Sequence, residues 1–101
     1  MSAAADAGAL RIEGEMGIYS AAELKRQLLE RLAGSPELAL DLAGVCEFDC
    51  AGVQLLLLAQ RAAHAAGGAL RLLSPSAAVV EALELLGLGE RLGLAAGGAL
   101  P

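Results

Sequence analysis

The side chains best able to do chemistry lie together in one short stretch, Asp49-Cys50-Ala51-Gly52-Val53. A long apolar segment begins at Cys50, which places Asp49 at the N-cap of a helix, where its carboxylate can accept a hydrogen bond from an amide one turn in. The first amides of a helix lack partners within it and carry a partial positive charge. Because Ala51 and Gly52 lack bulk, another group could approach the backbone closely there. The stretch therefore predicts either a purely structural cap or a place that holds an anion or a phosphorylated side chain.

Cys50 is the nucleophile of this stretch. A thiol at the start of a helix can be unusually reactive, which suggests a redox switch, but the neighbouring carboxylate of Asp49 opposes that reactivity. Cys50 can equally be a small substitute for Ser or Thr. A disulfide with Cys46 is a third reading, which spacing alone does not decide. Two cysteines and the lone His64 do not make a tetrahedral metal site, so we expect no metal and no other cofactor.

A catalytic constellation is not evident in the sequence. His64 has no Ser or Cys partner near it, and helix periodicity places it on a solvent-facing side. Gly67-Gly68 precedes a predicted strand, so it is better explained as a helix C-cap than as a phosphate loop. No acid–base pair emerges from the acidic residues nearest the N-terminus, which are Asp6, Glu13, Glu15 and Glu23. The sequence therefore predicts a protein that is not an enzyme.

Three strands are predicted to position the stretch. Apolar and polar residues alternate over residues 9–14 and 37–42, the period of a half-buried strand. In the first strand this turns Leu10 and Ile12 toward the interior. The short, mostly apolar run at residues 69–73 is predicted to be the third strand. Residues 43–49 are predicted to be a short connection that leads from the second strand to the helix at Cys50.

Three helices are predicted between and after these strands, at residues 21–33, 50–66 and about 75–86. Ser20 and Glu23 have the spacing of a capping box, in which each side chain bonds the other's backbone amide. Gly34 is placed as a left-handed C-cap of the first helix. Ser74-Pro75 is placed as the N-cap and first residue of the last helix, which Gly87 ends. The sides expected to face the core carry aliphatic residues at helical spacing, which are Leu24, Leu28, Leu32, Val79, Val80, Leu83 and Leu86.

The order of these elements, β-α-β-α-β-α, predicts one small α/β domain in which helices cross over between parallel strands. The chain has 101 residues, enough for one core and not for two. We place the domain at residues 9–94, with a disordered lead-in at residues 1–8 and a weakly ordered tail at residues 95–101. Because 56% of the residues are hydrophobic but only one Phe, one Tyr and no Trp are present, the core must be aliphatic.

Composition also limits the partners. The net charge is −5 and the seven Lys and Arg residues are scattered, which argues against nucleic acid, because phosphates need a basic footprint. The same charge disfavours acidic membrane surfaces, and no apolar run is long enough for membrane insertion. The first ten residues lack the basic start of a signal peptide. With only two cysteines, the chain is predicted to be cytoplasmic.

The stretch from residue 40 to Gly52 resembles the motif of STAS domains, in which Asp is followed by Ser or Thr, a small residue, Gly and an aliphatic residue. Asp49-Cys50-Ala51-Gly52-Val53 has this pattern apart from its second position. The resemblance extends over about residues 9–92, and it includes the segment 14–24 and the last helix. It implies a small mixed β-sheet with helices packed against it, in a single-domain bacterial protein similar to anti-sigma-factor antagonists.

The resemblance implies that the chain binds a partner protein, with Asp49, Cys50, Ala51, Gly52 and Val53 at the contact. In the family, an antagonist docks on a histidine-kinase-like ATPase that serves as an anti-sigma factor or a chemotaxis-type kinase. Phosphorylation of the Ser or Thr after the motif Asp then breaks the complex, which is partner switching in signal transduction and transcription regulation. Cys50 occupies that phosphoacceptor position and cannot be phosphorylated as Ser or Thr. The alternative is a resemblance to the cytoplasmic STAS subunit of a phospholipid ABC transporter, which binds the transporter's ATPase subunit.

Overall fold

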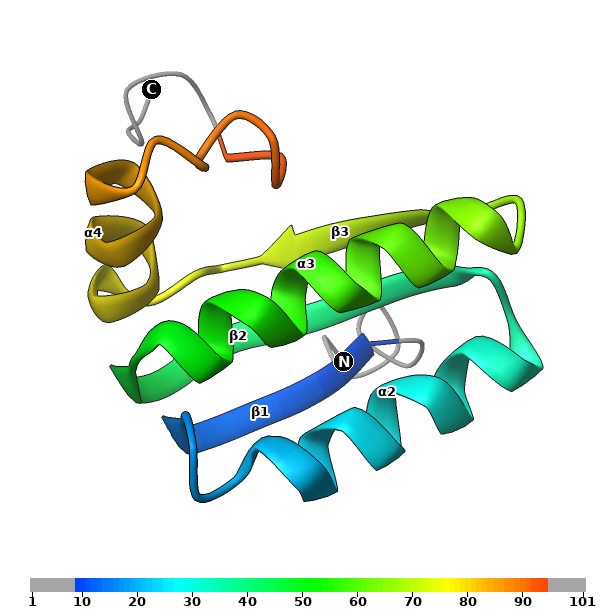
Figure 1. The fold of residues 1–101 in the computed structure, drawn as a ribbon, viewed down its shortest axis with the longest axis horizontal. Helices are drawn as coiled ribbons and strands as arrows, with labels where there is room; N and C mark the ends of the chain where they lie inside the picture. Colours follow the sequence, from blue (N-terminus) through cyan, green and yellow to red (C-terminus); the bar gives the residue numbers. More distant parts are fainter. Residues whose placement is uncertain (1–8, 95–101) are drawn as a thin grey trace, which may run out of the picture.

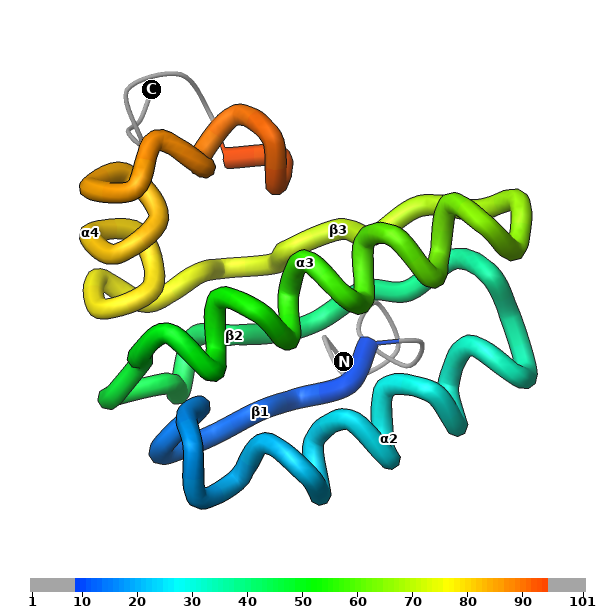
Figure 2. Tube along the Cα trace, in the orientation of Figure 1, coloured from blue at the N-terminus to red at the C-terminus, as the bar shows by residue number. Residues whose placement is uncertain are grey.

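The structure, a computed structural model, describes residues 9–94 as three strands and three helices in strict alternation (Figures 1 and 2). The elements follow in the order β1 (Ala9–Met16), α2 (Ala21–Gly34), β2 (Glu37–Phe48), α3 (Cys50–Ala65), β3 (Ala69–Leu73) and α4 (Ala77–Leu85). The predicted single-domain α/β class is therefore confirmed. The expectations for residues 1–8 and 95–101 lie outside the described residues.

The three strands form one sheet in the order β1-β2-β3, and both described pairings are parallel. Parallel neighbours need a crossover connection, and here each crossover is a helix, α2 between β1 and β2 and α3 between β2 and β3. Helices α2 and α3 lie side by side over the same face of the sheet, whereas α4 stands at one end, beyond β3 (Figure 1).

The central strand is longer than predicted. The expected connection at residues 43–49 is wrong, because β2 continues to Phe48. Its second half pairs with the end of β1, where Gly44 lies opposite Glu13 and Phe48 opposite Met16. Two irregularities in the pairing, between Arg11 and Glu13 and after Gly14, break the simple alternation along the strand. Extra residues of this kind disturb the in–out pattern on which the prediction relied.

The core is aliphatic, as predicted, and lies mainly between the helices and the sheet. Ile12, Leu24 and Leu28 are buried as expected. The largest fully buried side chains come from five of the six elements and from the turn after α4, and they are Met16, Leu28, Leu40, Leu42, Leu56, Leu83, Leu92, Val45 and Val79. Burying a Leu or Val side chain of this kind contributes about 1.5–3 kcal/mol each. The packed layer therefore holds the strand ends and helix starts in fixed relative positions.

Several predicted helix ends are wrong. The Ser20 side chain makes no capping bond to α2. The Glu23 carboxylate accepts hydrogen bonds from the side chains of Arg26 and Gln27 instead of from the backbone amide of Ser20. Gly34 is the last residue of α2 and is not left-handed. The last helix begins at Ala77, where Ser76 accepts a hydrogen bond from the amide of Val79.

Other helix ends follow the prediction. Gly67 and Gly87 adopt positive φ angles of 92° and 71° and terminate α3 and α4, as left-handed glycine caps do. The prediction that Leu86 faces the core is wrong, because it lies past the end of α4 and is 54% exposed. Within residues 9–94, no helix is both long and apolar enough to cross a membrane.

Candidate functional site

The start of α3 has the geometry that the sequence predicts. Asp49 is extended and stands at the N-cap, and its Oδ1 accepts hydrogen bonds from the amides of Ala51 at 2.9 Å and Gly52 at 3.4 Å. These are two of the donors that a helix start leaves without a partner. Cys50 is the first helical residue and is exposed.

Asp49 also ties a second segment to the helix start. Its Oδ2 accepts a hydrogen bond at 3.4 Å from the amide of Ile18, which lies 31 positions earlier in the loop between β1 and α2. Gly17 permits this approach, because a Cβ there would lie 2.6 Å from the same oxygen. One carboxylate therefore joins the two segments. The amides of Ala51 and Gly52 are not open to an outside anion, because the Asp49 carboxylate already accepts hydrogen bonds from them.

Gly52 and Val53 support the site from within. Gly52 is buried, and a Cβ on it would lie 2.4 Å from the Met16 carbonyl oxygen and 2.7 Å from the Phe48 ring. Val53 is 7% exposed and belongs to the core. The expectation that an outside group approaches the backbone at Gly52 is therefore wrong, because the chain itself fills that space. Of the five predicted residues, Asp49, Cys50 and the half-buried Ala51 reach the surface.

Two residues of the site were missed by the sequence reasoning. Ile18 is 67% exposed and Tyr19 is 88% exposed, in the loop that Asp49 holds. The sequence contains a feature that could have indicated them, because Tyr19 is the only Tyr of the chain and follows an aliphatic residue between two predicted elements. Their place beside Cys50 could not be read from the sequence, because the contact depends on how β1 and β2 pair.

Ser20 organises the same loop. Its hydroxyl donates to the carbonyl oxygen of Glu15 at 3.0 Å and accepts from the amide of Gly17 at 3.1 Å. The amide of Ser20 in turn donates to the Gly17 carbonyl at 3.1 Å. The hydroxyl predicted to cap α2 thus closes the turn before it. Ile18 and Tyr19 are consequently presented on a loop that is fixed at both ends.

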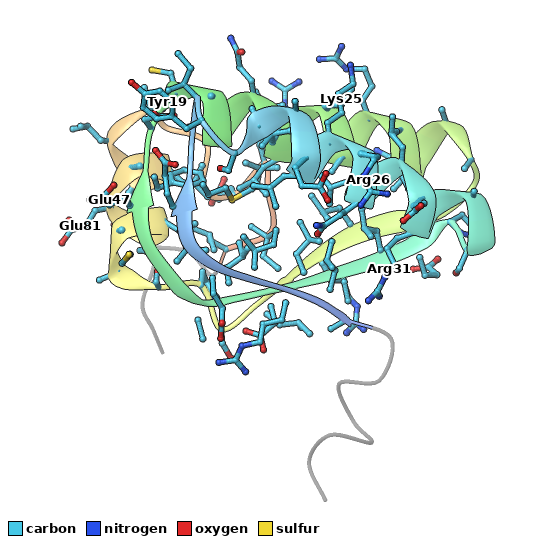
Figure 3. The ribbon with its side chains drawn as sticks, turned by 90° about the horizontal axis from the view of Figure 1, so that it is seen from below. Tyr19, Lys25, Arg26, Arg31, Glu47 and Glu81 are labelled. Carbon is cyan, nitrogen blue, oxygen red and sulfur yellow. The ribbon has the colours of Figure 1, made fainter. Side chains whose placement is uncertain are left out.

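A shallow apolar groove of about 310 Å³ continues from this loop along the boundary between α2 and α3. Its lining comes from the N-terminal parts of both helices and consists of Ala21, Ala22, Lys25, Ala51, Gln54, Leu55 and Leu58. Tyr19 and Lys25 lie on the same outer side of the helical layer, away from the sheet (Figure 3).

The charges on α2 divide into paired and unpaired groups. Arg26 forms ion pairs with Glu23 at 2.6 Å and Glu30 at 3.0 Å. The hydrogen bonds from Arg26 and then Gln27 lower the pKa of Glu23 to about 2. Lys25 is exposed and makes no ion pair with any residue between 9 and 94. The groove therefore has one uncompensated positive charge on its rim.

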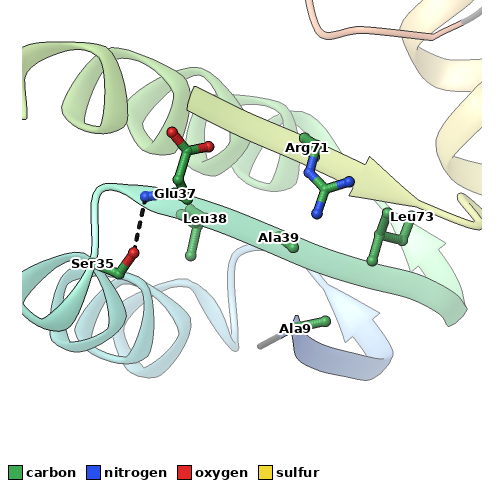
Figure 4. A pocket seen from close by; sticks show the side chains of 7 residues that line it. All are labelled: Ala9, Ser35, Glu37, Leu38, Ala39, Arg71 and Leu73. Atoms are coloured by element: carbon green, nitrogen blue, oxygen red, sulfur yellow. Dashed lines mark hydrogen bonds between the residues drawn. The ribbon is translucent and has the colours of Figure 1, made fainter. Parts of the chain in front are cut away.

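A second hollow, of about 300 Å³, lies at the other end of the sheet (Figure 4). It is lined by Ala9, Ser35, Glu37, Leu38, Ala39, Arg71 and Leu73, and the Ser35 hydroxyl accepts from the Glu37 amide at 3.2 Å. None of these residues belongs to the segments around Asp49, so this hollow is separate from the candidate site.

The remaining reactive side chains do not converge. Cys46 and Cys50 are both free and exposed. His64 is exposed near the far end of α3. Among residues 9–94, no group of three or more His, Cys, Asp or Glu side chains could hold a metal ion. The candidate site is thus a surface, made of the α3 start, the 17–20 loop and the groove.

The model of a protein family described as "Mlab, STAS domain" matches residues 1–95, nearly the whole chain. No curated protein matches the chain.

Proposed function

Because the chain belongs to the STAS domain family, whose members generally mediate protein–protein interactions, we propose that it is a cytoplasmic, non-catalytic docking module of bacterial signalling. Its partner in this proposal is a histidine-kinase-like ATPase of the anti-sigma-factor or chemotaxis type. The contact surface consists of Asp49, Cys50 and Ala51 together with Ile18 and Tyr19. Gly52 and Val53 shape that surface from the interior.

The observation that carries the proposal is the exposed apolar pair Ile18 and Tyr19, 67% and 88% exposed, held beside the α3 start by Asp49. In the isolated domain these two side chains remain in water and gain nothing from burial. In a complex, however, such residues form the water-excluding anchors of an interface, and Tyr is enriched among them. The surrounding loop is already ordered by Ser20 and Asp49, so binding would cost little conformational entropy.

Cys50 determines how such a complex could be regulated. In partner switching, a phosphate adds up to two negative charges in the middle of the interface and separates the partners. The exposed thiol of Cys50 cannot accept a phosphate as Ser or Thr does, and Ala51, the next position, has no hydroxyl either. The proposed docking is therefore constitutive, or is controlled by something other than phosphorylation at this helix start.

The same residue supports a second candidate function. A cytoplasmic STAS subunit of a phospholipid ABC transporter would bind its ATPase permanently and would need no phosphoacceptor. Cys50 and Ala51 suit such a subunit as well as they suit an unregulated antagonist. The two candidates share the docking surface and differ in the class of ATPase that it binds.

A pull-down from the source cell with three baits tests both candidates. The baits are the wild-type chain, Cys50→Asp and Cys46→Asp, and bound proteins are identified by mass spectrometry. Cys46 is the matched control, because it is also a free, exposed cysteine but belongs to β2. We expect wild type and Cys46→Asp to recover one ATPase, and Cys50→Asp to lose it, since the new carboxylate places an unpaired charge in the interface.

The identity of the recovered protein separates the two functions. A histidine-kinase-like ATPase would support the signalling role, and an ABC-transporter ATPase would support the lipid-transport role. Equal recovery of the ATPase by Cys50→Asp would remove the α3 start from the interface. Recovery of no ATPase by any bait would contradict both candidates.

A further inference from the structure

The groove between α2 and α3 exists because small residues face each other there. Ala21 and Ala22 on α2 and Ala51 on α3 line the groove. They are near the starts of two helices that run side by side in the same direction (Figure 1). Where two helices meet through alanines, little side-chain volume fills the outer part of the boundary between them. Leu55 and Leu58, one and two turns further along α3, complete an apolar lining.

The backbone around the groove favours a helical occupant. Both walls are α-helices, whose amides beyond the first turn and carbonyls before the last turn are bonded within each helix. The groove therefore offers no row of free backbone groups to an added strand, which needs such a row to satisfy its own amides. A helix satisfies its backbone internally and can place one apolar side in the groove, as amphipathic helices do in other grooves.

Charge further limits the occupant. Lys25 lies on the rim of the groove and has no ion-pair partner within residues 9–94, whereas its neighbour Arg26 is bonded to two glutamates. The chain as a whole carries a net charge of −5, but the groove lining contains no acidic side chain and one basic side chain, that of Lys25. An acidic side chain of a partner placed over this rim would gain an ion pair next to an apolar contact. Gln54 offers a hydrogen-bonding group across the groove.

We propose that an amphipathic helix of the partner protein docks in the α2–α3 groove and pairs an Asp or Glu with Lys25. This inference rests on the proposed docking function and adds the kind of partner surface that is bound. From Ala51 to Leu58 the lining extends seven positions along α3, about 10 Å of helix at 1.5 Å per residue. The docked helix therefore contributes about two turns, with small or aliphatic residues at spacings of three and four and the acidic residue at their edge.

Matched substitutions test the groove in a binding titration with the ATPase that the pull-down recovers. Ala22→Trp fills the groove and Lys25→Glu reverses the rim charge. Their controls are Ala33→Trp, an exposed alanine at the far end of α2, and Arg71→Glu, which makes the same charge change on β3. We expect the dissociation constant to rise about tenfold or more for both groove variants and less than about twofold for both controls. Circular dichroism confirms that each variant is folded.

A photo-crosslinker identifies the bound element directly. With benzoylphenylalanine at Ala22 in the full-length chain, mass spectrometry of the crosslinked ATPase should find a helical segment carrying an Asp or Glu. Changing that acidic residue to Lys should restore the affinity of Lys25→Glu to within about threefold of wild type. This rescue requires that the two charges meet.

The outcomes separate this inference from the docking function. If Cys50→Asp abolishes binding while Ala22→Trp and Lys25→Glu bind normally, docking stands and the groove inference is wrong. A crosslink to an extended segment, or failure of the charge swap, would also overturn it. If no bait recovers an ATPase, the inference falls together with the proposed function.

Discussion

Removing the Asp49 carboxylate should destabilise the domain by about 1–3 kcal/mol, because the group acts in two places. It caps α3 through the amides of Ala51 and Gly52 and accepts the amide of Ile18 from the preceding loop. Loss of an N-cap costs about 1 kcal/mol, with a range of about 0.5–2. Loss of one further hydrogen bond costs about 0.5–1.5 kcal/mol. The Ile18 bond is long, at 3.4 Å, and exposed, so its share belongs at the low end.

Urea unfolding of Asp49→Ala, Asp49→Asn and Glu47→Ala measures this effect. The Ala variant loses all three bonds, so its free energy of unfolding should fall by about 1–3 kcal/mol. In thermal unfolding, the same loss would lower the Tm of a domain of this size by about 4–24 °C. Asn is as good an N-cap as Asp, so Asp49→Asn should keep most of the stability. Glu47→Ala removes an exposed carboxylate from the adjacent strand end and should change the free energy of unfolding by less than about 0.5 kcal/mol. Equal destabilisation by Asn and Ala would refute the capping explanation, and so would a loss below about 0.5 kcal/mol in Asp49→Ala.

Two further predictions concern positions near the site. Gly52→Ala should lower the free energy of unfolding by about 1–3 kcal/mol, because its Cβ would meet the backbone carbonyl of Met16 at 2.4 Å. Gly34→Ala is the control, because Gly34 is also in a helix but has nothing within 4 Å of the added Cβ. It should be neutral or stabilising by up to about 1 kcal/mol. Similar losses of stability in Gly52→Ala and Gly34→Ala would contradict the packing argument. Glu23 has a pKa lowered from 4.5 to about 2 by Arg26, so its contribution to stability is present above pH 4.5 and is lost as the pH falls toward 2. Across this pH window, the free energy of unfolding measured with urea should fall less in Glu23→Gln than in wild type. The difference between the two proteins should shrink in high salt, because both charges are exposed. Identical pH profiles for the two proteins would contradict this prediction.

The sequence by itself determined the features whose causes lie within a few residues. Asp49 caps α3 because the amides that it bonds are only two and three positions further along. Gly67 and Gly87 end their helices for a similarly local reason, since a left-handed residue is most easily supplied by glycine. The length and apolar character of residues 50–65 fixed the helix that carries the site, and the alternation of helices and strands fixed the α/β class.

Local signals failed where a distant group competed for the same atoms. The Ser20 hydroxyl suits a helix cap, but in the folded chain it bonds Glu15 and Gly17 at the turn after β1. The second half of β2 reads as a connection until the end of β1 pairs with it. Ser74-Pro75 has the pattern of a helix start, yet Ser76 is the residue whose side chain bonds the first turn of α4.

The candidate site divides in the same way. Asp49 and Cys50 could be found from the sequence, because their types and spacing mark the start of a long helix. Only the tertiary structure placed Ile18 and Tyr19 beside them, buried Gly52 against Met16 and Phe48, and opened the groove next to Lys25. These features depend on the parallel pairing of β1 with β2, which brings together residues about 30 positions apart. A hydrophobic pattern specifies which side of an element is buried, but the partner against which it packs is chosen only when the whole sheet and its helices assemble.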